Sequence, residues 1–224
     1  MTNTLQNSLI NLFSINRLDS YKYAADDTDY TVIERYLYNI EISKSLYPLL
    51  SILEVSLRNR LNQAIETTVK SDWLLNELQQ QDILRNNEYN KLLAAKQKLI
   101  KKGHVTISKD DLIAELSLGF WIHLCTKYYK TKLWHTQGFF RIVFADYPDF
   151  SEFDKLSKVF PILQLMLKIR NRIFHHEIII NHPHGIENCY NDLRTLLGYI
   201  SKDGLQYLDK ICDFSDVFTK QKPR

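Results

Sequence analysis

Apolar side chains recur at steps of three and four between residues 31 and 66, and this spacing constrains the fold more than any other feature of the chain. The positions are Ile33, Tyr36, Leu37, Ile40, Leu46, Leu49, Leu50, Leu53, Leu57, Leu61 and Ala64. Because an α-helix has about 3.6 residues per turn, this pattern puts the apolar side chains on one face of long helical structure. Pro48 interrupts the pattern, so we expect it to separate two helices or to lie in the first turn of the second.

Similar patterns and helix-end signals predict further helices. The expected ranges are 73–78, 89–102, 109–130, a short helix opening at 151–154, 161–176 and 186–200. Ser108 and Asp111 have the spacing of a capping box, and Pro161 is expected to be a first helical residue, where its missing N–H costs nothing. The chain has only 6 glycines and 5 prolines among 224 residues, and no sustained period-two alternation, so the predicted fold class is all-α.

Charge and cysteine usage exclude several classes of protein. The net charge of +3 is compatible with nucleic-acid binding but does not require it. Three widely spaced cysteines without a C-x-x-C pair indicate neither a disulfide framework nor a structural zinc site. Residues 1–17 lack the pattern of a signal peptide and no apolar run reaches 18 residues, so we expect a cytoplasmic protein without a membrane span.

The octapeptide RNRIFHHE at residues 170–177 carries the chemistry that the rest of the chain lacks. Histidine can both donate and accept a proton near neutral pH, and arginine matches phosphate oxygens with a bidentate fork. Together they could activate a ribose 2′-hydroxyl and stabilise the transition state of phosphodiester cleavage without a metal. On a continuous helix Arg170 lies about 140° from His175, so either its side chain reaches around or the helix ends near His175.

The neighbours of these two residues leave alternatives open. Asn171 is four residues before His175, and Arg172 is four before His176, so each pair shares a helix face. Arg170 continues an apolar row, which indicates a buried partner, a groove or a subunit interface. The alternative is that these residues only cap the end of the helix, because short motifs also arise by chance.

A second polar cluster, LEVSLRNRLN at residues 53–62, lies within the apolar pattern. Glu54 and Arg58 are four residues apart and are expected to pair on one helix face, either in a functional role or as a structural ion pair between helices. The chain has further motifs in order: YNI at 38–40, Ser43, LGFW at 118–121, Trp134 and the R-N-x-x-x-H form of residues 170–175. Over residues 14–200 this set resembles the Abi-like (abortive infection) family of bacterial phage-defence proteins, which is grouped with the HEPN superfamily.

The resemblance implies a HEPN-like helical bundle with additional helices. It would form a single domain over residues 1–224, with its core at 14–200 and a basic tail at 219–224. It also implies a metal-independent endoribonuclease toxin without a cofactor, acting on RNA, with an antitoxin as a further possible partner. The catalytic residues would be Arg170, Asn171 and His175. The auxiliary residues would be His176, Glu177, Glu54, Arg58 and Asn59. Whether His175 or His176 is catalytic stays open, because the superfamily tolerates four to six intervening residues.

One chain has a single such motif, because Gln63 and Ala64 stand where a second histidine would follow Arg58. Two facing motifs would therefore require a homodimer. The alternative functions are a non-catalytic RNA- or protein-binding HEPN module and a structural partner in a defence complex.

Other candidates are less specific. Lys96, Lys98, Lys101, Lys102 and Arg172 could contact RNA phosphates, although a lysine-rich helix face is more often only solvated. The histidines at 175, 176, 182 and 184 lack the acidic or cysteine ligands of a standard metal site, so no metal is expected. Aromatic residues at 121, 134, 139, 140 and 144 are expected to fill the core, and Cys125 to be a buried hydrophobe.

Overall fold

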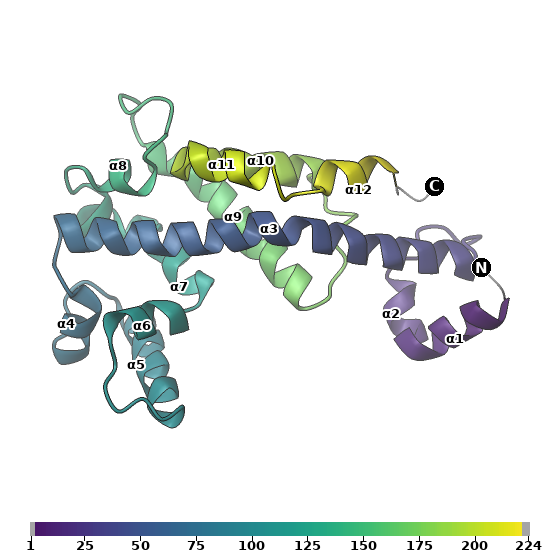
Figure 1. The fold of residues 1–224 in the computed structure, drawn as a ribbon, viewed down its shortest axis with the longest axis horizontal. Helices are drawn as coiled ribbons and strands as arrows, with labels where there is room; N and C mark the ends of the chain where they lie inside the picture. The colour runs from purple at the N-terminus through teal and green to yellow at the C-terminus, as the bar shows by residue number, and fades with distance from the viewer. Residues whose placement is uncertain (1–2, 221–224) are drawn as a thin grey trace.

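The computed structural model describes residues 3–220, and every regular element in that part of the chain is helical (Figure 1). The elements are α1 (Asn3–Phe13), α2 (Ile15–Asp19), α3 (Asp29–Thr68), α4 (Trp73–Gln79), α5 (Asn86–Lys101), α6 (Lys109–Glu115), α7 (Leu118–His123), the 3₁₀ turn η1 (Lys127–Tyr129), the π-helical turn η2 (Lys130–Trp134), α8 (Phe139–Val143), α9 (Lys155–Phe174), α10 (Ile186–Ile200), α11 (Lys202–Leu208) and α12 (Phe214–Lys220). The prediction of an all-α fold is confirmed. No helix within residues 3–220 is both long and apolar enough to cross a bilayer.

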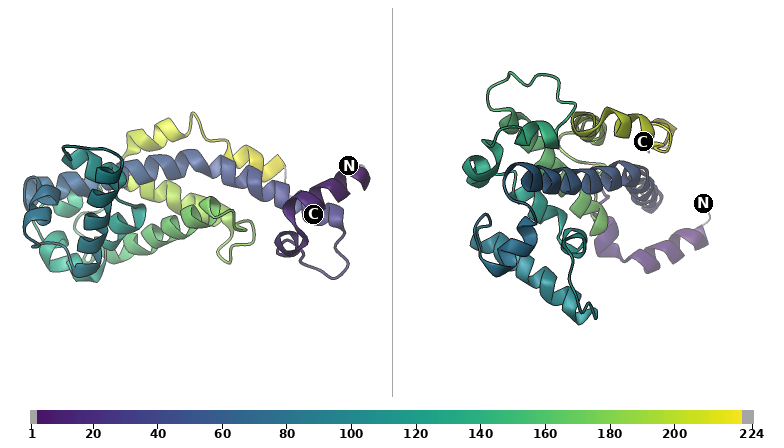
Figure 2. Two further views of the ribbon diagram at one scale, coloured as in Figure 1. Left: turned by 90° about the horizontal axis from the view of Figure 1, so that it is seen from below. Right: turned by 60° about the vertical axis from the view of Figure 1, so that its left-hand side comes forward.

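Helix α3, 40 residues long, is the axis of the molecule. Its first turn is stabilised by the Thr28 hydroxyl, which accepts a hydrogen bond from the N–H of Thr31 at 3.2 Å. Figure 1 shows α10, α11 and α12 along one side of α3, with α9 crossing behind it. Figure 2 shows that α4, α5 and α6 gather at the end of α3, whereas α1 and α2 lie at its beginning. The apolar stripe of α3 is therefore covered along its length.

Neither proline ends a helix, so both predicted boundaries were wrong. Pro48 lies inside α3, and Pro161 lies inside α9, which begins six residues earlier at Lys155. An interior proline costs roughly 3 kcal/mol because it removes one backbone hydrogen bond. Burial on both sides offsets that cost: Leu46 and Leu49 flank Pro48 and are fully buried, and the buried stripe of α9 runs through Pro161 from Leu156 to Ile169.

The single helix expected at 109–130 is wrong as well. The capping box of Ser108 and Asp111 does begin α6, but the chain becomes extended at Leu116 and restarts at Leu118 as α7. Most residues of the segment after this break are buried: Leu118, Phe120, Trp121, Ile122, Leu124 and Cys125. One face of a straight helix could not bury so many consecutive side chains, and the break allows the chain to do so.

One large core joins nearly all the helices, and the expected aromatic side chains belong to it. Trp121, Trp134, Phe139 and Phe144 are buried, and Phe140 packs against them. Cys125 is fully buried as predicted, and burial raises the pKa of its thiol.

Both ends of the chain contain helices that the sequence analysis did not predict. A smaller cluster of Leu18, Tyr21 and Val32 holds α2 to the beginning of α3. Helices α1, α2, α11 and α12 were not anticipated from the sequence. The expected basic tail is partly helical, since α12 includes residues 219 and 220, and residues 221–224 lie outside the described part of the chain.

Candidate functional site

Helix α9 ends within the predicted motif. Its last helical residue is Phe174, and the backbone amides of the next residues turn back onto the helix. The N–H of Glu177 donates to the carbonyl of Arg172 at 2.7 Å, and the N–H of His176 donates to that of Ile173 at 3.0 Å. This is the Schellman pattern, with His176 at φ 56° in the left-handed position that glycine usually fills. Of the two alternatives left open by the sequence, the helix ends near His175.

The segment after the motif is fastened to α3 by a buried amide. Asn39 is only 4% exposed, and its Oδ1 accepts hydrogen bonds from the N–H groups of Ile179 at 2.8 Å and Ile180 at 3.4 Å. Its Nδ2 donates to the carbonyl of Glu177 at 3.3 Å. The guanidinium of Arg17 donates to the carbonyl of His176. The position of the two histidines is therefore fixed from both α2 and α3.

Arg170 lies in a half-open groove between α3 and α9, of about 230 Å³. Its Nε is 3.3 Å from Oε2 of Glu54, and its guanidinium lies 4.4 Å from the centre of the Phe174 ring. The Glu54 carboxylate on α3 and the Phe174 ring on α9 therefore both orient the guanidinium. The predicted pairing of Glu54 with Arg58 is wrong, because the Glu54 carboxylate turns across to α9.

Arg58 is left as a second cation in the same groove. Its Nε is buried and has no hydrogen-bond partner, and no ion pair involves Arg58 within residues 3–220. The groove thus holds two guanidiniums and one carboxylate, which gives an excess of one positive charge. Such a groove suits an anionic ligand that can occupy the free donors of Arg58.

The two histidines lie beside this groove rather than in it. His175 is exposed, and its backbone N–H donates to the backbone carbonyl of Asn171 at 2.9 Å. His176 lines a larger neighbouring hollow of about 700 Å³ along α3. Tyr47 and Phe174 line both hollows, so the rings of these two residues form the ridge between the Arg170 groove and His176.

The remaining motif residues are spread around the helix end. Asn171 is half-buried, and its backbone carbonyl accepts a hydrogen bond from the backbone N–H of His175. Arg172 and Glu177 form an ion pair of 3.6 Å with each other, and neither is among the groove residues. Asn59 is exposed on α3 and is not among the groove residues. The structure thus brings Arg170 together with Glu54 and Arg58, and leaves Asn59 apart from them.

The lysines proposed as RNA contacts are partly neutralised. Lys98 and Lys102 both form ion pairs of 2.5 Å with Glu115 of α6, which lowers the pKa of that carboxyl through hydrogen bonds from Lys102 and Lys98. Lys101 is exposed and Lys96 is half-buried. Two of the four lysines therefore hold α5 to α6, whereas Lys96 and Lys101 form no ion pair with any residue between 3 and 220.

The remaining histidines of the motif region have structural partners. His182 contacts the thiol of Cys189 at 3.3 Å, and burial together with nearby positive charge lowers its pKa. His184 pairs with Asp192 at 2.9 Å. Within residues 3–220, no group of three or more His, Cys, Asp or Glu side chains is placed to hold a metal ion.

Sequence reasoning did not identify the two rings that separate the hollows, nor the positioning role of Asn39. Asn39 could have been found, because an amide next to a buried aromatic in an apolar stripe requires buried partners. Tyr47 gave no such signal, since an exposed tyrosine on a helix is common.

Comparisons of the chain with protein-family models, with curated proteins and with solved structures found no match. What this site does must therefore be inferred from its own geometry and from the motif residues described above.

Proposed function

We propose that this protein is a metal-independent endoribonuclease of the Abi-like HEPN type, acting as a toxin in phage defence. The observation that carries the proposal is the arrangement at the end of α9. An oriented guanidinium, Arg170, lies in a positively charged groove, and two exposed imidazoles follow immediately beyond the last helical turn. This is the set of groups that cleavage by an attacking 2′-hydroxyl requires.

Each residue has a role in this mechanism. Arg170, supported by Arg58, binds the scissile phosphate and neutralises the charge that develops on it. His175 takes the proton from the ribose 2′-hydroxyl or gives one to the leaving 5′-oxygen. The approaching phosphate competes with Glu54 for Arg170, and the carboxylate keeps the guanidinium oriented until then. Asn171, one helical turn before His175, orients one of these catalytic groups or holds the phosphate.

The proposal includes a homodimer with a two-fold axis near the ends of the two α9 helices. Partly exposed apolar side chains line the groove, Tyr47 (55%), Val55 (41%) and Phe174 (48%), and Ile40 (42%) lines the neighbouring hollow. An apolar surface of this kind favours burial against another protein surface, and a two-fold interface brings two copies of any patch together. A second chain would also bring a second pair of histidines toward the groove. A strictly monomeric protein at micromolar concentration that is fully active would contradict the dimer.

The test is cleavage of single-stranded RNA by the purified full-length chain in the presence of a chelator. The expected products carry a 2′,3′-cyclic phosphate, because the 2′-hydroxyl is the nucleophile. A substrate with 2′-deoxyribose at the cleavage site serves as the control and should stay intact. Activity lost completely in chelator, or retained on the deoxy substrate, would refute the mechanism.

The second candidate function is a non-catalytic RNA- or protein-binding HEPN module. The observation that favours it is that His175 is not among the residues lining the Arg170 groove, while the ridge of Tyr47 and Phe174 separates His176 from that groove within one chain. This module would bind RNA without cleaving it. Binding that depends on Arg170 and Arg58, combined with no cleavage by the wild-type protein, would establish it over the enzyme.

A further inference from the structure

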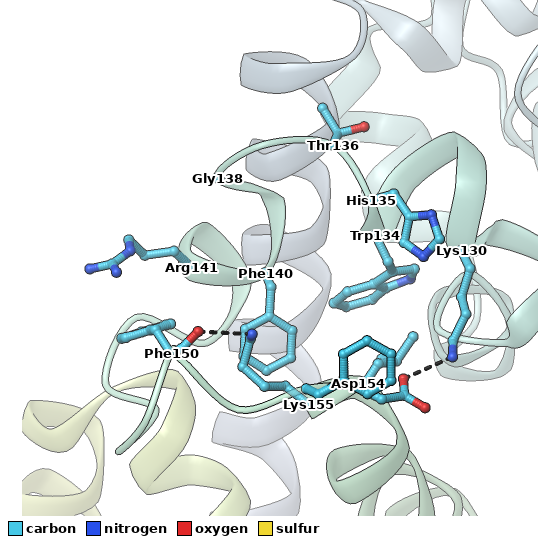
Figure 3. A pocket seen from close by; sticks show the side chains of 12 residues that line it. Lys130, Trp134, His135, Thr136, Gly138, Phe140, Arg141, Phe150, Asp154 and Lys155 are labelled. Carbon is cyan, nitrogen blue, oxygen red and sulfur yellow. Dashed lines mark hydrogen bonds and ion pairs between the residues drawn. The ribbon is translucent and has the colours of Figure 1, made fainter.

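A separate cavity of about 420 Å³ lies between the η2–α8 segment and the beginning of α9 (Figure 3). It shares no lining residue with the α3–α9 groove. Its volume is within the range of small-molecule sites. Its lining combines aromatic rings with basic side chains, and this combination determines which ligand chemistry fits.

The charges of the cavity favour an anion. Lys130 forms an ion pair of 2.8 Å with Asp154, as Figure 3 shows. Lys155 donates to two backbone carbonyls, those of Phe150 at 2.9 Å and residue 152 at 2.8 Å. Arg141 lies 4.0 Å from the centre of the Phe150 ring. Within residues 3–220, neither Lys155 nor Arg141 has a carboxylate at ion-pair distance, so the three cations exceed the single carboxylate by two charges.

The rings of the cavity favour a planar ligand. Trp134, Phe140, Phe150 and Phe153 line it. Phe153 is 97% exposed, so its ring offers nearly its whole surface to a ligand. Aromatic faces of this kind stack on nucleic-acid bases, and stacking tolerates any base because each has a π-face. A cationic ligand, which aromatic rings can also hold, is disfavoured by the three basic side chains.

Unusual backbone conformations converge on the same cavity. The π-helical turn η2 supplies Lys130 and Trp134 from its two ends. Gly138 has φ 83°, and Asp154 has φ 52° although it is not a glycine. Single π-helical turns and left-handed non-glycine residues are rare, and they concentrate at functional sites. This backbone places the cations and the rings around one opening.

We propose that the cavity binds a nucleoside phosphate, with the base against the aromatic rings and the phosphate on Arg141 and Lys155. A free mononucleotide and one nucleotide of an RNA strand present the same chemistry. In the second case the cavity adds an RNA contact distant from the cleavage groove. The inference does not depend on cleavage, because binding at this cavity can be measured in a protein that cleaves nothing.

The test uses the fluorescence of the full-length protein. Trp134 lines the cavity and is 8% exposed, whereas Trp73 and Trp121 are at most 1% exposed, so a fluorescence change on binding at the cavity reports chiefly on Trp134. The protein is titrated in parallel with AMP, with adenosine, with inorganic phosphate and with a short single-stranded RNA. His175→Ala is used for the RNA titration, so that cleavage and binding are measured apart.

Two exposed side chains give variants that leave the fold intact: Phe153→Ala and Arg141→Ala. Loss of base stacking should weaken binding roughly 5- to 150-fold, and loss of the guanidinium about tenfold or more. Tyr207→Ala and Lys210→Ala are the matched controls, because they remove an exposed ring and an exposed cation elsewhere. Both controls should bind as the wild type does.

Binding of AMP that both cavity variants weaken supports a free nucleotide as the ligand. Binding of the RNA alone, weakened by the same variants, supports a nucleotide within a strand. Three results would overturn the proposal: no binding of either ligand, phosphate binding as tightly as AMP, or unchanged binding in Phe153→Ala and Arg141→Ala.

Discussion

Asn39→Ala should destabilise the protein strongly, because this amide fastens the segment after the motif to α3. The substitution removes the acceptor of the Ile179 N–H, which is fully buried, and such an orphaned donor costs about 1–3 kcal/mol. The longer contacts to Ile180 and to the carbonyl of Glu177 add about 1 kcal/mol together. The expected loss in the free energy of unfolding is therefore about 2–4 kcal/mol. For a chain of this size it corresponds to about 4–16 °C in melting temperature.

The assay is urea denaturation of the wild type and the variant, with hydrogen exchange at the amides of Ile179 and Ile180 measured in parallel. Asn59→Ala is the matched control, since Asn59 lies on the same helix but is exposed, and it should change stability by less than about 0.5 kcal/mol. Equal stability of the two variants, or unchanged protection of the Ile179 amide, would refute the reasoning.

Three further substitutions test other contacts of the fold. Glu54→Ala should lower the free energy of unfolding by at most about 1 kcal/mol in urea denaturation, because the pair with Arg170 is about a quarter exposed, and a loss of 3 kcal/mol would contradict this. Hydrogen bonds from Arg35 and from backbone amides hold the pKa of Asp27 well below its usual range. The stabilisation that the ionised carboxylate gives the folded protein is therefore complete above about pH 4 and is lost as the pH falls further. Asp27→Asn should therefore destabilise the protein at neutral pH. In denaturation measured across pH, the free energy of unfolding of the variant should fall less steeply below about pH 4 than that of the wild type. An unchanged pH profile would count against the contact. Pro161→Ala should raise stability by about 1–3 kcal/mol in thermal melts, since Pro161 is exposed inside α9, and lower stability would indicate that the proline is needed there.

The fold was predictable where local pattern and burial agree. The stripe of α3, the range of α10 and the capping box before α6 follow from spacing and end signals, and the structure has them. The prolines at 48 and 161 misled the prediction, because local propensity places a helix boundary there while burial on both sides outweighs it. The prediction of one helix over residues 109–130 was wrong for the opposite reason. Its apolar content suggested one helix, and the packing of nearly every residue required a break.

The pairing of the candidate residues could not be predicted from the sequence. The spacing of Glu54 and Arg58 allows an ion pair within one helix, yet the carboxylate bonds Arg170, which is 116 residues away in the chain. No local sequence pattern predicts a contact between residues so far apart in the chain, because the packing of the whole core sets how α9 approaches α3. The cavity beside η2 was also missed, since its lining comes from turns whose backbone conformations have no periodic signal.

Cleavage of RNA by His175→Ala, measured beside its melting temperature, tests the central claim most directly. The proposed role as general acid or base predicts a rate lower by roughly 10²–10⁴-fold than that of the wild type, with the melting temperature nearly unchanged because His175 is exposed. His176→Ala, measured in the same way, decides which histidine carries the proton. Wild-type cleavage in both variants would contradict the catalytic assignment. A loss of activity accompanied by unfolding of His175→Ala would show instead that this histidine only caps α9.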